Sequence, residues 1–220
     1  MTAPLTVACV WVQANVPYTV EYVVNLRAMV AKHLARPHRF VCLTDRSYLL
    51  PKSIETQVTV LPPGLAGWWA KVLLFNRARR LGSRVLALDL DTLIVAPLDP
   101  IVDYPAPFAL VPDAGTFHPR TAHRVIHRFN SSAMIWSAGA VESLYDHWTP
   151  AVTGRLWGDQ DWIGEQMPDA ATMPIEWFPR LSELHGAPPG SAAKVVLVKK
   201  PKTHIAADLY PWVRHAWRAA

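Results

Sequence analysis

Apolar runs along the chain alternate with amphipathic stretches, and this alternation predicts strands and helices in turn. Residues 5–12 (LTVACVWV) are apolar and rich in β-branched side chains, which predicts a buried strand. Apolar residues then recur at three- and four-residue spacing over residues 19–35, from the capping residue Thr19 to a stop before Pro37, which predicts an amphipathic helix. Residues 39–44 predict a second strand. A strand, helix and strand in this order favour a right-handed parallel crossover, and hence an α/β sheet with a ligand site at the carboxyl ends of its strands.

The rest of the chain continues the α/β pattern. Residues 84–90 are mostly apolar and predict a fully buried strand. The other predicted strands cover residues 57–61, 108–111, 132–136 and 195–198, and the other predicted helices cover residues 67–80, 140–148 and 210–218. No repeat and no linker divides the sequence, so we expect one domain over residues 1–220.

Composition narrows the class of protein. The chain has 220 residues, of which 51% are hydrophobic and 18% charged, and this composition excludes a disordered or fibrous protein. No apolar run reaches the roughly 18 residues of a membrane-spanning helix, and the first residues lack the basic start and cleavage site of a signal peptide. We therefore expect no transmembrane segment and a cytoplasmic location. Cys9 and Cys42 lie within apolar runs, which predicts buried thiols rather than a disulfide or a thiolate metal site.

Two aspartates at the end of the predicted strand 84–90 are the first candidate functional residues. In extended backbone Asp89 and Asp91 point to the same side, so their carboxylates share a small volume. Like charges at short distance repel unless a cation compensates them, and carboxylate oxygens are preferred ligands of Mg²⁺ and Mn²⁺. The pair predicts a divalent-metal site, with two solvated turn aspartates as the alternative. The spacing alone is a weak signal, because a second Asp-x-Asp occurs at residues 159–161.

Five blocks of sequence occur in the order seen in nucleotide-sugar glycosyltransferases. They are GWWAKVLLFN (67–76), RVLALDLDTLIVAPLDPI (84–101), FNSSAMIW (129–136), GDQDWIGE (158–165) and KPKTH (200–204). The chain resembles family 8 of these enzymes, the glycogenin-like and lipopolysaccharide-galactosyltransferase-like group, in its short bacterial and phage forms. The resemblance covers most of the chain and implies a GT-A fold, which is a single Rossmann-like nucleotide-binding α/β domain with a mixed sheet. It also implies a hexosyltransferase that uses a nucleotide sugar, with a UDP-hexose as the expected donor and retention of the anomeric configuration.

The resemblance assigns residues to the donor and its metal. Asp89 and Asp91 match the positions that hold Mn²⁺ or Mg²⁺ against the donor diphosphate. This assignment agrees with the chemistry of the reaction, because a bound cation neutralises the negative charge of a leaving group. The residues that match donor-binding positions, besides Asp89, are Gln13, Asn15, Tyr18, Lys71, Asn130 and Lys202. Three of them have plainer alternatives: Tyr18 as a loop-packing residue, Lys71 as an exposed helix lysine and Asn130 as a turn residue.

The block at residues 158–165 lies beside the transferred sugar in relatives. The resemblance therefore assigns Asp159, Gln160 and Asp161 to catalysis. Gln160 and Asp161 would position the sugar and stabilise an oxocarbenium-like centre. The alternative is structural, because Asp159 could cap a short helix and Asp161 could be a favourable charge in its first turn.

The sequence does not identify the third metal ligand with certainty of position. Relatives carry a metal-binding histidine shortly before the closing basic motif, but residues 194–203 contain none. His204 lies just beyond this segment and is the candidate ligand, with an ordinary surface or core histidine as the alternative.

The charge distribution raises the question of the acceptor. The whole formal net charge of +5 lies in residues 194–220, which hold six Lys and Arg against one acidic residue. A solvated basic tail would explain this segment without a partner. Otherwise it forms, with Arg120, Arg124 and Arg128, a basic rim that binds an acidic acceptor such as an acidic protein or a nucleic acid.

Two other classes of protein share part of these signals. Phosphatases of the haloacid-dehalogenase type use Asp-x-Asp-x-Thr after an apolar strand, which would make Asp89 a nucleophile and Asp91 an acid and base. No acidic pair follows a later apolar strand, however. A polyanion-binding module would rest on the basic segment alone and leave the paired carboxylates unexplained. We therefore expect a metal-dependent glycosyltransferase.

Overall fold

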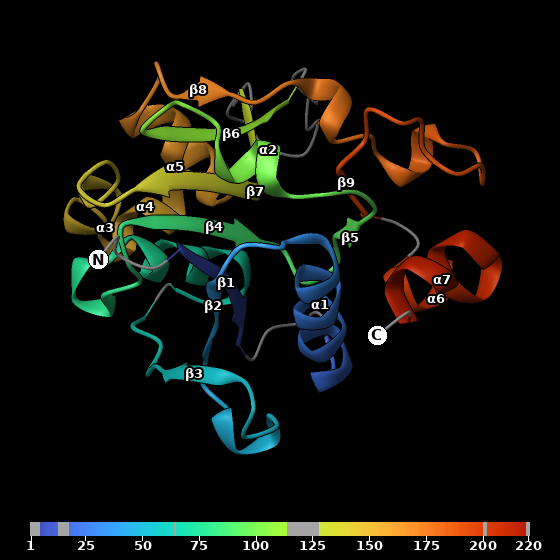
Figure 1. Cartoon of the computed structure of the whole chain (residues 1–220). Helices are drawn as coiled ribbons and strands as arrows, with labels where there is room; N and C mark the ends of the chain where they lie inside the picture. Colours follow the sequence, from blue (N-terminus) through green and yellow to red (C-terminus); the bar gives the residue numbers. More distant parts are fainter. Residues whose placement is uncertain (1–4, 13–17, 64, 114–127, 200–201, 219–220) are drawn as a thin grey trace.

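The computed structural model describes residues 5–12, 18–63, 65–113, 128–199 and 202–218. Within these residues, seven strands form one mixed sheet in the order β3-β2-β1-β4-β7-β6-β8 (Figure 1). β1 pairs in parallel with β2 and β4, whereas β7 runs antiparallel to β4 and β6. The strands of the sheet are β1 (Leu5–Trp11), β2 (His38–Thr44), β3 (Glu55–Val58), β4 (Arg84–Leu88), β6 (Phe108–Pro112), β7 (Phe129–Ser137) and β8 (Ala171–Thr172). A separate antiparallel pair joins β5 (Leu93–Ile94) to β9 (Val195–Val196).

Helices cover both faces of the sheet (Figure 1). α1 (Val20–His33) lies on one face with α7 (Pro211–Arg218), and α5 (Asp159–Gln166) lies on the other with the 3-10 helix η2 (Gly67–Phe75). The remaining helices in the described ranges are α2 (Asp99–Val102), α3 (Ser143–Asp146), α4 (Pro150–Arg155), α6 (Thr203–Leu209) and the short 3-10 helices η1 (Ser47–Leu49), η3 (Arg77–Arg79), η4 (Ile175–Trp177) and η5 (Leu181–Glu183).

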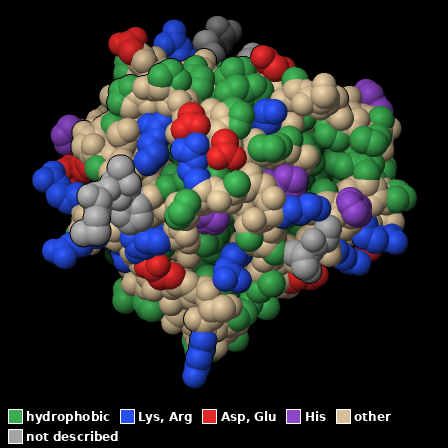
Figure 2. All heavy atoms as spheres, in the orientation of Figure 1, with side chains coloured by type: hydrophobic (Ala, Val, Ile, Leu, Met, Phe, Trp, Pro, Cys, Tyr) green, Lys and Arg blue, Asp and Glu red, His purple; other side chains and the backbone are tan. Residues whose placement is uncertain are grey.

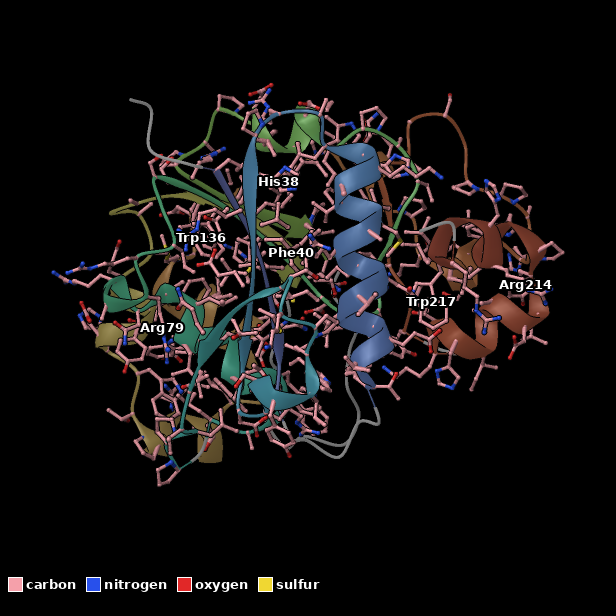
Figure 3. All side chains as sticks on the ribbon, turned by 60° about the horizontal axis from the view of Figure 1, so that its bottom comes forward. His38, Phe40, Arg79, Trp136, Arg214 and Trp217 are labelled. Atoms are coloured by element: carbon pink, nitrogen blue, oxygen red, sulfur yellow. The ribbon has the colours of Figure 1, made fainter. Side chains whose placement is uncertain are left out.

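Both faces of the sheet are buried because side chains alternate along each strand. In β1, Val7 and Cys9 belong to the core under α1, whereas Ala8 belongs to the core under η2. Trp217 of α7 is fully buried beside α1 (Figure 3), with its ring centroid 5.2 Å from that of Tyr22. The C-terminal helix therefore completes the core on the α1 face.

The strongest sequence patterns correspond to observed elements. The strands predicted at 5–12, 39–44 and 84–90 are β1, β2 and β4, and the helix predicted at 19–35 is α1, with ends that shift by at most two residues. The weaker patterns are less accurate. For example, the strand predicted at 57–61 corresponds to β3, which begins and ends earlier in the sequence. α6 was not predicted at all, since its seven residues are too few to show a clear period.

The prediction of one helix over residues 67–80 is wrong. This segment forms η2 and η3, which are separated at Asn76, whose backbone is extended (φ −69°, ψ 115°). Asn76 Oδ1 accepts a hydrogen bond from the backbone N of Ala78 at 2.9 Å, so a local side-chain contact replaces a helical bond. Most of η2 is apolar and buried, and such a segment does not reveal whether a turn takes 3.0 or 3.6 residues.

The predicted buried thiols are confirmed. Cys9 and Cys42 are buried and free, and they lie opposite each other in the register of β1 and β2. Among the helices in the described ranges, none combines the length and the apolar character needed to cross a bilayer.

Candidate active site

The predicted aspartates lie in the turn that follows β4. The backbone N of Asp89 donates to the carbonyl of Ser132 at 2.8 Å, and Thr92 Oγ1 donates to the carbonyl of Asp89 at 2.8 Å. Because β7 runs antiparallel to β4, the first residues of β7 lie beside the last residues of β4. The turn is thus held by β7 and by a hydrogen bond between two of its own residues. Asp91 is only 8% exposed, so it is not the solvated turn aspartate of the alternative interpretation.

Lys71 of η2 connects three other elements at this edge. Its Nζ lies 3.0 Å from Asp89 Oδ1 and 3.3 Å from Asp159 Oδ2 at the start of α5. It also donates to Ser131 Oγ of β7 at 2.7 Å. The Lys71 side chain is 12% exposed, so the interpretation of an exposed helix lysine is wrong. Burial by itself lowers the pKa of Lys71, but the charges of Asp159 and Asp89 outweigh burial and raise that pKa above its ordinary value.

The first turn of α5 contains the three residues assigned to catalysis. Asp159 is 3% exposed, and burial raises its pKa while the charge of Lys71 opposes that shift. The N-cap of α5 is Gly158, so the interpretation of Asp159 as the cap is wrong. Asp161 Oδ2 accepts hydrogen bonds from the backbone N of Trp157 at 3.1 Å and of Gly158 at 3.3 Å. Asp161 therefore anchors the chain before the helix, and Gln160 lies half-buried between the two aspartates.

A second lysine occupies the other half of the site. Lys202 Nζ lies 3.0 Å from Asp91 Oδ2 and donates to Tyr18 Oη at 2.7 Å, and Tyr18 Oη donates to the same Asp91 oxygen at 2.5 Å. Thr203 Oγ1 donates to the carbonyl of Asp91 at 3.0 Å. Burial and the charge of Asp89 raise the pKa of Asp91, and the ammonium of Lys202 opposes that shift. Lys202 and Thr203 of the closing basic motif therefore both contact Asp91 of the β4 turn.

The remaining predicted residues are placed differently. His204 Nδ1 is 2.6 Å from Tyr22 Oη, and the described residues contain no cluster of three side chains able to ligate a metal. The structure therefore does not bring His204 into a three-ligand group with Asp89 and Asp91. Asn130 Oδ1 accepts from the backbone N of Ser132 at 2.8 Å, which is the turn-forming contact of its alternative. The residues predicted here that lie outside the described ranges are Gln13, Asn15, Arg120 and Arg124.

Ser131 is a site residue that sequence reasoning missed. Its hydroxyl is the shortest contact of Lys71, at 2.7 Å, and it is 3% exposed. It directly follows the predicted Asn130 within the block FNSSAMIW, and side chains of adjacent strand residues point to opposite faces. The predicted neighbour thus identified the right strand, but not which of its residues contacts Lys71.

The comparisons with known proteins bear on this geometry. No family model matches the chain, and no curated protein matches its sequence. By structure, 266 solved chains match. One is the galactosyltransferase LgtC, solved in complex with donor and acceptor sugar analogues, which superposes with a TM-score of 0.61 over 90% of this chain and 88% of that chain at 12% identity. The chain has the GT-A fold. The predicted fold class is therefore confirmed, and in this GT-A sheet the two lysines and three aspartates meet at the carboxyl end of β4.

On the face shown in Figure 2, Lys and Arg side chains are scattered and alternate with Asp and Glu rather than gathering into one basic patch. Arg214 Nε donates to a backbone carbonyl of α6 at 3.0 Å, and Arg218 lies 3.6 Å from Asp208. Part of the charge that suggested an acidic acceptor is thus engaged within the helical pair. The acidic acceptor stays a prediction.

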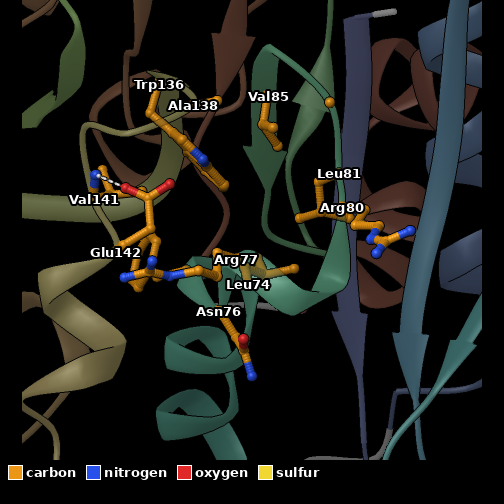
Figure 4. A pocket seen from close by; sticks show the side chains of 12 residues that line it. Leu74, Asn76, Arg77, Arg80, Leu81, Val85, Trp136, Ala138, Val141 and Glu142 are labelled. Carbon is orange, nitrogen blue, oxygen red and sulfur yellow. Dashed lines mark hydrogen bonds between the residues drawn. The ribbon is translucent and has the colours of Figure 1, made fainter.

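A pocket of about 300 Å³ lies at the other end of β4 (Figure 4). Its lining includes Val85 and Trp136, and the carboxylate of Glu142 at its edge accepts backbone hydrogen bonds from Gly139 and Val141. Four strand positions, or about 13 Å, separate Val85 from the aspartate turn. This pocket is therefore separate from the candidate site.

Proposed function

We propose that the protein is a glycosyltransferase that moves a sugar from a nucleotide-sugar donor to an acceptor hydroxyl. The observation that carries the proposal is the meeting of Asp89, Asp91 and Asp159 with Lys71 and Lys202 at the carboxyl edge of a GT-A sheet. In such sheets, ligands bind beyond the carboxyl ends of the strands. The similar structure of LgtC holds donor and acceptor sugar analogues, which supports the same class of reaction.

Asp89 and Asp91 fit a divalent cation. Burial and the charge of Asp89 raise the pKa of Asp91, and a cation beside the two carboxylates would relieve the repulsion between them. Mg²⁺ commonly binds through one or two carboxylates and completes its shell with water and substrate phosphates, so a third protein ligand is not required. When bound, Mn²⁺ or Mg²⁺ would neutralise charge on the leaving nucleoside diphosphate.

The two lysines would take different parts in the transfer. Lys202 reaches Asp91 from the start of α6 and is 30% exposed, so it can exchange this carboxylate for a diphosphate oxygen when the donor binds. Lys71 is more deeply buried and contacts two carboxylates, so it would stay in place and keep Asp159 ionised. An ionised Asp159 would stabilise positive charge that develops at the anomeric carbon, with Gln160 positioning the sugar.

The proposed transfer needs no reactant other than the donor and the acceptor. The acceptor oxygen forms a bond to the anomeric carbon, and the bond from that carbon to the diphosphate oxygen breaks with its electron pair on the nucleoside diphosphate. The acceptor proton passes to the leaving diphosphate or to water. We propose a UDP-hexose as donor and retention of configuration, in line with the resemblance noted in the sequence.

Incubation with a panel of nucleotide sugars and Mn²⁺ tests the proposal. We expect one donor, with UDP as its nucleotide, to be hydrolysed slowly to the nucleoside diphosphate and a free sugar whose first-formed anomer has the donor configuration by NMR. Release of inorganic phosphate from phosphate esters, with every nucleotide sugar left intact, would instead support the phosphatase interpretation of Asp89 and Asp91.

Replacement of Lys202 by alanine is expected to weaken binding of UDP about tenfold to a hundredfold, because a hydrogen bond to a charged group contributes roughly 1.5 to 3 kcal/mol. Isothermal titration calorimetry measures this affinity directly. Lys52→Ala is the matched control, since Lys52 is an exposed lysine in the segment before β3. Equal UDP affinity of both variants and the unmodified protein would show that Lys202 does not contact the donor.

A further inference from the structure

The pocket at the start of β4 has the size and the lining of a small-molecule site. Its volume of about 300 Å³ lies at the lower end of the range for such sites. Buried apolar side chains from three elements form its wall, among them Phe75 of η2, Val85 of β4 and Trp136 of β7. The rings of Phe75 and Trp136 meet edge to face, with centroids 5.4 Å apart and planes inclined by 64°. The wall is therefore a packed aromatic surface.

Two turns of the backbone border the pocket. In the first, Arg80 adopts the left-handed conformation (φ 47°), which is uncommon for a residue other than glycine, and Gly82 has φ of 116°. Leu81 between them is 7% exposed and belongs to the lining. The second turn contains Ala138, whose backbone N donates to the carbonyl of Ser83 at 2.9 Å. This hydrogen bond joins the two turns, so the backbone on this side of the pocket is fixed.

Trp136 carries an unused hydrogen-bond donor at the pocket. The residue is 3% exposed, and its indole N–H has no hydrogen-bond partner among the described residues. Trp162 of the same core donates its N–H to a backbone carbonyl at 2.8 Å, as buried tryptophans usually do. Trp148 Nε1 and Trp217 Nε1 also lack a partner, but neither residue lines the pocket. Figure 4 shows the Trp136 indole extending from β7 into the space that the lining residues surround, where a ligand would supply the missing acceptor.

The polar side chains around the pocket offer donors to a ligand, because their acceptors are already engaged. The carboxylate of Glu142 accepts hydrogen bonds from two backbone N–H groups at 2.8 and 3.1 Å, and Asn76 Oδ1 accepts one at 2.9 Å. Arg77 and Arg80 form an exposed rim. Arg77 pairs with Asp146 at 2.9 Å, whereas the guanidinium of Arg80 has no hydrogen bond or ion pair with the described residues. A carboxylate group, which accepts hydrogen bonds and carries negative charge, complements this lining.

We propose that this pocket binds a small aromatic carboxylate. The ring of the ligand packs against Phe75 and Trp136, which bury its apolar surface and offer edge or offset contacts between rings. Its carboxylate lies between the Trp136 N–H and the rim formed by Arg77 and Arg80. Because about 13 Å of β4 separates the pocket from the aspartate turn, this ligand is neither the sugar donor nor the acceptor. The inference therefore goes beyond the proposed function and does not rest on it.

Phenylacetate and phenylacetamide serve as a matched pair of probes, because they share the ring and the size but only phenylacetate carries a charge. Each is titrated against the full chain by isothermal titration calorimetry. We expect phenylacetate to bind at one site per chain, and phenylacetamide to bind at least about tenfold more weakly, since a hydrogen bond to an ionised acceptor is stronger than one to a neutral acceptor. Saturating UDP should leave the affinity for phenylacetate unchanged.

Two variants locate the bound probe. Ala138→Phe places a large side chain at the edge of the pocket from an exposed position, and it should weaken phenylacetate binding at least about tenfold. Trp136→Phe keeps an aromatic ring but removes the N–H, and it should weaken binding about tenfold. Ala187→Phe is the matched control, since Ala187 is an exposed alanine outside the lining, and it should bind phenylacetate as the unmodified protein does. Melting temperatures of all three variants verify that each is folded.

Four outcomes would overturn the inference. Absence of phenylacetate binding would show that the pocket does not take this class of ligand, and equal affinity for the two probes would show that it does not select a carboxylate. Normal binding by Ala138→Phe would place the probe elsewhere on the protein. Competition between phenylacetate and UDP would place it in the candidate active site. None of these measurements uses a sugar donor, so each outcome leaves the test of the proposed function unaffected.

Discussion

Replacement of Asp91 by asparagine is expected to lower sugar transfer and donor hydrolysis roughly 100- to 1,000-fold, because a metal ion on the leaving diphosphate contributes several kcal/mol to the transition state. Asp91 is the more buried aspartate of the β4 turn, and it loses its negative charge in this variant while its shape is retained. Treatment with EDTA should abolish turnover of the unmodified protein to a similar extent, and added Mn²⁺ should restore it. Initial rates of nucleoside diphosphate release measure both effects.

Asp103→Asn is the matched control for this substitution. Asp103 is exposed and pairs with Arg36 at the surface, so the same change of charge there should leave the rate unchanged. Full activity of the unmodified protein after EDTA treatment would refute the metal requirement. Full activity of Asp91→Asn would show that the cation, if required, is held elsewhere.

Replacement of Lys71 by methionine is expected to destabilise the fold by about 3 to 5 kcal/mol at neutral pH, because it leaves the buried Asp159 without its partner charge. For a chain of this size, that loss lowers the melting temperature by roughly 6 to 20 °C. The loss should shrink as the pH falls. Burial already raises the pKa of Asp159, and without Lys71 the folded state binds this proton still more tightly than the unfolded state, so stability decreases as the pH rises. Thermal melts between pH 4 and pH 8 measure the effect.

The double variant Lys71→Met with Asp159→Asn is the control for this prediction. It removes both charges, and we expect it to recover a large part of the lost stability and to remove the pH dependence. Lys202→Met should destabilise the fold less than Lys71→Met, since the Lys202 side chain is 30% exposed and the Lys71 side chain only 12%. A Lys71→Met variant as stable as the unmodified protein would show that Asp159 is not held in the buried ion pair seen here.

The sequence by itself determined the elements with strong local patterns. The apolar run of β4, the period of α1 and the paired aspartates after β4 can all be identified from a few neighbouring residues. Local spacing reports burial and periodicity because the backbone repeats every 2 or 3.6 residues. The GT-A fold was predicted from the order of five sequence blocks, and the structural comparison confirms it. Lys71 and Lys202 were placed at the donor by resemblance, but nothing in their own segments says which carboxylate each one contacts.

The tertiary structure decided which of these residues meet. The contact of Lys202 with Tyr18 spans 184 positions of sequence, and the stacking of Trp68 on Trp157 depends on a hydrogen bond across 89 positions. Such contacts follow from the strand order, which inserts β1 between β2 and β4 and sets the antiparallel β7 beside β4. Burial of Lys71 was equally invisible in sequence, because it depends on η2 packing against α5 and β7 rather than on its neighbours in the chain. A local pattern can identify the strand that carries a carboxylate, but the charge that balances it is supplied by whichever distant segment the fold places there.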